Sequence, residues 1–97
     1  MREVFLVKVD KKEEAEGILK RDEEISRGSI IVKSASSLDI DEEGYFIILD
    51  ATEHSIKKAV TMLKNTAHAY KDKEKVLYAY EKQEETAMQG FGNIMGD

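Results

Sequence analysis

The sequence predicts a single α+β domain built as a two-layer sandwich, in which helices pack on an antiparallel sheet. Runs rich in β-branched and aromatic residues recur at residues 4–9, 29–34 and 45–50, as expected of strands. Between and after these runs, apolar residues recur every three or four positions, which is the spacing of a helix with one buried side. The chain has 97 residues, of which 41% are hydrophobic, so it is large enough to bury one core.

The first third of the chain predicts a strand followed by a helix. Residues 4–9 form the strand, and Asp10, directly after it, is expected to cap the helix. The helix is expected to run to about Glu24, before Gly28 ends the pattern. Its narrow apolar side consists of Ala15, Ile18 and Leu19. We therefore expect this helix to lie on the surface of a sheet.

The middle of the chain predicts a β-hairpin and a second helix. Residues 29–34 and 45–50 are expected to pair across a long polar loop. Either Asp50 or Thr52 can cap the helix that follows. Apolar residues keep the helical period for about five turns, at Ile56, Ala59, Val60, Leu63, Ala67 and Tyr70. This helix is expected to cover the same face of the sheet as the first one.

The chain beyond the second helix predicts a fourth strand at residues 76–80, with Val76, Tyr78 and Tyr80 on one side. The order β-α-β-β-α-β is that of the ferredoxin-like fold, a four-stranded antiparallel sheet with two helices on one face. Alternatively, residues 74–88 are helical, and the chain forms a three-stranded sheet in the order β-α-β-β-α-α.

The expected domain comprises residues 1–80, and residues 81–97 form a helical or flexible C-terminal extension. Both faces of the expected sheet are apolar, because both sets of alternating residues in the strands are apolar. Two helices can cover only one face, so we expect a second copy of the chain or the C-terminal segment to cover the other. The residues of this predicted interaction surface are Phe5, Val7, Tyr45, Ile47, Tyr78, Tyr80, Met88, Phe91, Ile94 and Met95.

The composition favours a protein partner over nucleic acid or a membrane. A net charge of −5 repels phosphate backbones. Cysteine is absent, which excludes disulfides and cysteine-based metal sites and favours a cytoplasmic location. Lys8 interrupts the first apolar run too early for a signal peptide, and no stretch is apolar enough to span a bilayer. Abundant Lys and Glu are typical of thermophile surfaces.

No pattern in the sequence predicts a catalytic site, a metal site or a cofactor. The loop from Asp39 to Gly44 matches the start of a calcium-binding EF-hand loop, but its flanks predict strands instead of helices. His54 and His68 fall in the same predicted helix, about 21 Å apart along its axis, so they cannot share a metal ion. Ser55, next to His54, points about 100° away from it on a helix, which excludes a catalytic triad.

An enzyme whose carboxylates, such as Asp39, Asp41 and Asp50, converge with a lysine is compatible with the sequence but is not favoured by it. Three non-enzymatic functions are favoured over it. The leading hypothesis is a non-enzymatic interaction or assembly module that forms a homodimer or binds a protein partner. A small-molecule-binding regulatory domain is the second, and the predicted topology alone supports it.

The third function is single-stranded RNA binding. Residues 4–9 resemble the shorter signature of the RNA-recognition motif, and Gly44, Tyr45 and Ile48 match part of its longer one. The longer signature is otherwise not matched, because Glu43 stands where the motif has a basic residue. The resemblance covers about one seventh of the chain and implies that bases stack on aromatic side chains. These would be Phe5, Tyr45, Tyr78 and Tyr80.

Overall fold

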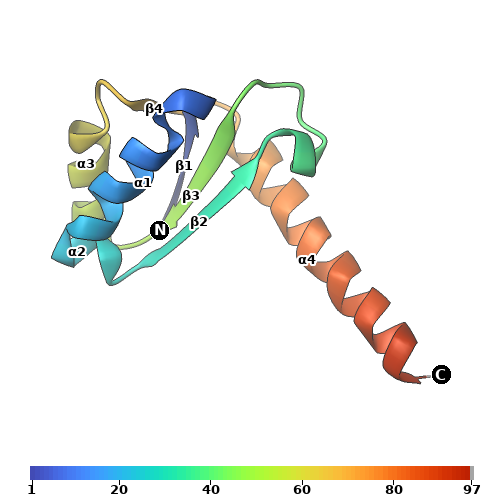
Figure 1. Ribbon diagram of the computed structural model, residues 1–97. Coiled ribbons are helices and arrows are strands. Elements are labelled where there is room, and N and C mark those ends of the chain that lie inside the picture. Colours follow the sequence, from blue (N-terminus) through green and yellow to red (C-terminus); the bar gives the residue numbers. More distant parts are fainter. Residues whose placement is uncertain (97) are drawn as a thin grey trace.

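The computed structural model describes the backbone of residues 1–96 and the side chains of residues 1–85. Its centre is a four-stranded antiparallel sheet with helices on both faces (Figure 1). The strand order is β2-β3-β1-β4. The strands are β1 (Arg2–Val7), β2 (Ser29–Ser34), β3 (Tyr45–Asp50) and β4 (Ala67–Ala69). The molecule is therefore an α+β sandwich, as the sequence predicts, and the strands at 29–34 and 45–50 have the predicted bounds.

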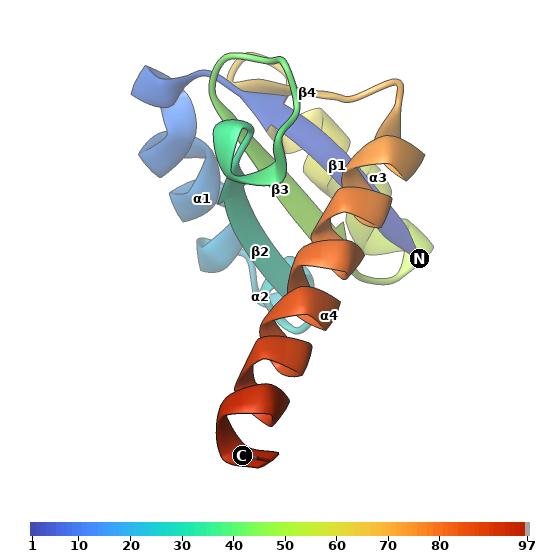
Figure 2. The ribbon, with the colours of Figure 1, turned by 90° about the vertical axis from the view of Figure 1, so that its right-hand side faces the viewer.

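The helices divide between the two faces of the sheet. Helices α1 (Lys12–Arg21), α2 (Glu23–Ser26) and α3 (Glu53–Met62) lie on one face, here called the helix face. Helix α4 (Lys73–Gly96) passes across the opposite face, here called the α4 face, and projects beyond the sheet (Figures 1 and 2). Two short 3-10 turns, η1 (Val9–Lys11) and η2 (Ser36–Leu38), follow β1 and β2.

The first predicted helix is interrupted at Asp22. Lys11 is the N-cap of α1 and makes no side-chain capping bond, so the prediction that Asp10 caps this helix is wrong. Asp22 adopts extended backbone angles at the end of α1. Its carboxylate accepts hydrogen bonds from the backbone N–H groups of Glu24 and Ile25, at 3.0 and 3.1 Å. Asp22 therefore caps α2, because an aspartate oxygen satisfies N–H groups that have no partner within the helix.

The second predicted helix is shorter than its apolar period suggests. Thr52 caps α3 by accepting a hydrogen bond from the N–H of Ser55 at 3.1 Å, but the helix ends at Met62 instead of continuing to Tyr70. The chain then turns and forms β4, in which His68 pairs with Leu6 of β1. Pairing with the open edge of β1 satisfies the backbone of β4, so tertiary contacts override the local helical pattern.

The predicted fourth strand at residues 76–80 is wrong, because these residues form the second turn of α4. The alternative that residues 74–88 are helical agrees with the structure. The three-stranded sheet of this alternative is wrong, because β4 supplies a fourth strand from residues whose apolar period predicted a helix. Val76 and Tyr80 are four residues apart, which puts them on one side of a helix as well as of a strand. The ferredoxin-like assignment stays a prediction.

Each face of the sheet has its own buried cluster. The cluster on the helix face is formed by Phe5, Val7, Ala15, Leu19, Ile25, Ile47, Leu49, Ile56, Ala59 and Leu63. The cluster on the α4 face is formed by Val4, Ala35, Leu38, Ile40, Phe46, Ile48 and Val76. The Tyr70 ring meets Phe46 edge to face on that side, with centroids 4.9 Å apart. The chain itself therefore covers the second apolar face, with residues 35–40 and the first turns of α4.

The conformation of Gly44 and one hydrogen bond beside it determine how the edge strand β2 pairs with β3. Gly44 precedes β3 with φ +112, and a Cβ there would collide with the carbonyl oxygen of Val7, so only glycine fits. Next to it, the N–H of Ala35 donates to the Gly44 carbonyl at 3.0 Å. Opposite residues of two antiparallel strands alternate between hydrogen-bonded and non-hydrogen-bonded pairs. The bond at Ala35 therefore determines which residues of β2 form hydrogen bonds with β3. Residues 31 and 33 of β2 bond to β3, while 30, 32 and 34 direct their N–H and C=O groups outward.

Candidate functional site

Three residues of the predicted interaction surface lie inside the protein. Phe5, Val7 and Ile47 belong to the buried cluster beneath α1 and α3, and none is more than 1% exposed. The prediction that alternate strand residues share a face is correct for these three. They face the helices, however, so they cannot contact a partner while the domain is folded.

The tyrosines of that surface lie in different places. Tyr45 packs against the edge of the helix-face cluster, with the Lys12 ammonium 5.0 Å from its ring centre. Tyr80 packs on the α4 face, where Lys33 lies 5.8 Å from its ring centre. Tyr78 is 64% exposed. With Phe5 buried, these aromatic side chains do not form the common stacking surface that RNA binding through them would need.

Helix α4 is attached to the sheet by its first three turns. Val76 is fully buried there. Polar contacts follow at Glu81, whose carboxylate lies 2.9 Å from the Arg2 guanidinium, and at Gln83, whose Nε2 donates to the Ser37 carbonyl at 2.9 Å. The side chains of Met88, Phe91, Ile94 and Met95 lie outside the described residues. The helix backbone that carries them extends away from the sheet (Figures 1 and 2).

Charged side chains connect α2 with α3 on the helix face. The Lys58 ammonium lies 2.8 Å from the Asp22 carboxylate and 3.5 Å from that of Glu24. The hydrogen bond from Lys58, and then that from the Ile25 N–H, hold the pKa of Asp22 below its ordinary value. His54 Nε2 lies 3.4 Å from Glu24. This network joins two helices, and its groups pair with one another.

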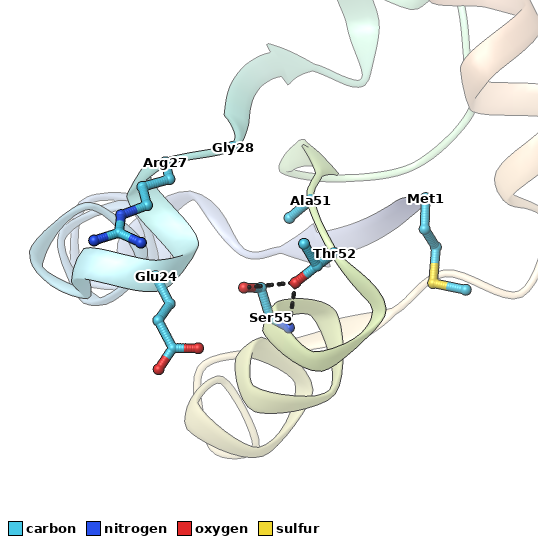
Figure 3. A pocket seen from close by; sticks show the side chains of 7 residues that line it. All are labelled: Met1, Glu24, Arg27, Gly28, Ala51, Thr52 and Ser55. Atoms are coloured by element: carbon cyan, nitrogen blue, oxygen red, sulfur yellow. Dashed lines mark hydrogen bonds between the residues drawn. The ribbon is translucent and has the colours of Figure 1, made fainter.

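A cavity of about 500 Å³ lies beside this network, between α2 and the start of α3. Figure 3 shows the Thr52 and Ser55 hydroxyls directed at each other, and the oxygens are 3.1 Å apart. Ser55 is 3% exposed and bonds to Thr52, while the neighbouring His54 pairs with Glu24. The serine therefore completes a helix cap, and the structure does not pair it with a histidine base.

The histidines and acidic loop considered as ligands are not brought together. His54 is on α3 and His68 is on β4, so the prediction that both share one helix is wrong. Asp39 adopts left-handed backbone angles at the end of η2, within a loop that connects two strands. Among the described side chains, no three His, Asp or Glu groups gather where they could share a metal ion. In residues 1–96, no helix has an apolar stretch long enough to cross a bilayer.

Comparison of the chain with protein-family models, with curated proteins and with solved structures finds no match.

The structure has a basic cavity at one end of the sheet that the sequence did not predict. It lies where β1 ends and where the chain turns from α3 into β4, and its volume is about 260 Å³. Its lining residues are Leu6, Lys8, Lys11, Lys64, Asn65, Thr66, Ala67 and His68. These come from two segments more than 50 positions apart in the sequence. Only the pairing of β4 with β1 brings them together. The apolar period of the sequence predicted a helix through this region instead.

Proposed function

We propose that the protein is a non-enzymatic assembly module that binds a second copy of itself through the C-terminal half of α4. The supporting observation is that this helix continues beyond the sheet that its first turns cover. A helix of 24 residues is roughly 36 Å long. The described contacts of α4 with the rest of the domain involve its first half, up to Gln83.

The sequence of the projecting part supports the proposal of a packing partner. Most helical stability in proteins comes from packing of one helix side, and short helices are marginal in water. Each glycine in a helix interior costs about 1 kcal/mol relative to alanine. Gly90 and Gly92 both fall in this part of α4. A second surface that packs against the helix would offset this cost.

Charge favours a second copy of this chain as the partner. The whole chain carries a net charge of −5, so two copies repel each other over most of their surfaces. Residues 86–96 contain no Asp, Glu, Lys, Arg or His. They contain the apolar residues Met88, Phe91, Ile94 and Met95. Two copies can therefore meet along this segment without like-charge repulsion.

The α4 face is a poorer candidate for self-association. Val4, Phe46 and Ile48 are buried beneath the chain's own α4 and residues 35–40. A partner on this face would first have to displace Val76 and Tyr80 from it. The projecting helix requires no such rearrangement.

The solution mass by light scattering tests this proposal. We expect the full chain to have twice the mass of one chain, and Phe91→Asp to have the mass of one chain, because the new charge would have to be buried between copies. Tyr78→Asp adds the same charge to an exposed site of α4 and should leave the dimer intact. A monomeric full chain, or dimers that persist in Phe91→Asp, would overturn the proposal. Circular dichroism checks that both variants are folded.

A further inference from the structure

The basic cavity at the end of β1 gathers cations and hydrogen-bond donors. Three lysines line it, Lys8 after β1, Lys11 in η1 and Lys64 after α3. Asn65, Thr66 and His68 add an amide, a hydroxyl and an imidazole. No carboxylate is among its described lining residues, although the chain has 20 acidic residues and 15 basic ones.

Most of the charges that line this cavity are not neutralised by an ion pair among the described residues. Some lysines elsewhere pair with carboxylates, as Lys57 does with Glu53 at 3.3 Å and Lys58 with Asp22 at 2.8 Å. Others, such as Lys71 and Lys75, do not pair with any described carboxylate. None of the described carboxylates forms an ion pair with Lys8, Lys64 or His68. Lys11 meets Glu14 at 3.5 Å, in an exposed pair that is worth little in water. Like charges around one cavity repel each other, and a bound anion would relieve that repulsion.

We propose that this cavity binds the phosphate group of a small phosphorylated molecule. Lysine binds phosphate as a point charge, and hydrogen bonds to ionised oxygens are roughly twice as strong as neutral ones. The amide of Asn65 and the hydroxyl of Thr66 can donate to the remaining phosphate oxygens. The site lies at the β1 end of the sheet and uses no residue of α4, so it is independent of the proposed self-association.

The surroundings favour a compact anion over a nucleic acid strand. An adjoining cavity shares Leu6, Lys8 and His68 with the basic one, and acidic residues line its other side. These are Asp10, Glu42 and Glu43. A polyanion that ran across the site would meet these carboxylates and be repelled. The basic cavity, at about 260 Å³, is also smaller than the roughly 300–1,000 Å³ of sites for drug-sized ligands.

Titration of the full chain with pyrophosphate, followed by amide NMR shifts, tests the proposal. We expect saturable shifts centred on residues 8–11 and 64–68. The double variant Lys8→Gln/Lys64→Gln should bind at least about tenfold more weakly, since it loses two charged hydrogen bonds. Lys71→Gln/Lys75→Gln removes the same charge from two other exposed lysines and should change the affinity less than about twofold. The amide spectra themselves show whether each variant is folded.

Three results would overturn the proposal. The first is the absence of saturable shifts at millimolar pyrophosphate. The second is an equal loss of affinity in both double variants, which would mean that pyrophosphate responds only to net charge. The third is a single-stranded oligonucleotide that displaces pyrophosphate and binds more tightly through the same residues. None of these results depends on the mass of the protein in solution, so they leave the assembly proposal unaffected.

Discussion

The two faces of the sheet are equally apolar but are covered in different ways. On the helix face, α1 and α3 each contribute a side that the sequence marks by its helical period, and the residues beneath them are buried. On the α4 face, the cover comes from residues 35–40 and from the start of a helix whose other end projects beyond the sheet. A period of 3.6 is evident when a whole helix packs on a sheet. The same period is hard to recognise in the sequence when only the first turns of a helix pack on the sheet.

The largest expected effects come from the matched pair Phe5→Ala and Phe46→Ala. Phe5 is buried on the helix face and Phe46 on the α4 face. Removing a buried phenylalanine ring costs about 3–5 kcal/mol. We expect Phe5→Ala at the upper end of this range and Phe46→Ala at the lower end, because α4 and the loop can settle into the space left by Phe46.

Urea unfolding at neutral pH measures the free energy of unfolding of both variants. Phe46→Ala costing more than Phe5→Ala would mean that the cover of the α4 face is as firmly fixed as the two helices opposite.

Substitutions at residues 76 and 78 distinguish a helical cover from a strand. Val76 is fully buried and Tyr78 is 64% exposed. Val76→Ala should therefore cost about 2 kcal/mol of unfolding free energy, and Tyr78→Ala less than about 0.5 kcal/mol. In a strand the two residues would share one side and both would be costly. Comparable losses in thermal or urea unfolding would contradict the helix at this position.

The smallest expected effect concerns the charges that join α2 and α3. The hydrogen bond from Lys58 lowers the pKa of folded Asp22 below its unfolded value. A depressed carboxyl pKa stabilises the fold above the unfolded pKa of about 3.9, and this contribution is lost as the pH falls through the folded pKa.

Asp22→Asn keeps a capping side chain but removes the charge. We expect this variant to be less stable than the parent at neutral pH and to match it near pH 2. Glu23→Gln removes an equal charge one residue along, on a residue that does not contact Lys58, and serves as the control. Unfolding midpoints are measured across this pH range. If Asp22→Asn and Glu23→Gln lost stability with the same pH dependence, the stabilising role of the bond between Lys58 and Asp22 would be contradicted.

The sequence predicted the layers of the fold better than its connections. Residues 29–34 and 45–50 are found as strands because long apolar runs suit buried strands. Residues 67–69 (AHA) contain nothing typical of a strand, and they become β4 only because β1 has an open edge beside them. The basic cavity depends on the same pairing of β4 with β1, because this pairing brings Lys8 and Lys64 to one cavity. No local pattern in either segment could have revealed it.

Strand β2 has two kinds of backbone amide in alternation. The N–H groups of residues 31 and 33 are held in the ladder with β3, whereas those of residues 30, 32 and 34 point away from β3 at the edge of the sheet. In heavy water, hydrogens on the outward set would exchange with solvent far sooner than those on their immediate neighbours. Slow exchange at the outward positions would thus report that another chain had added a strand to this edge.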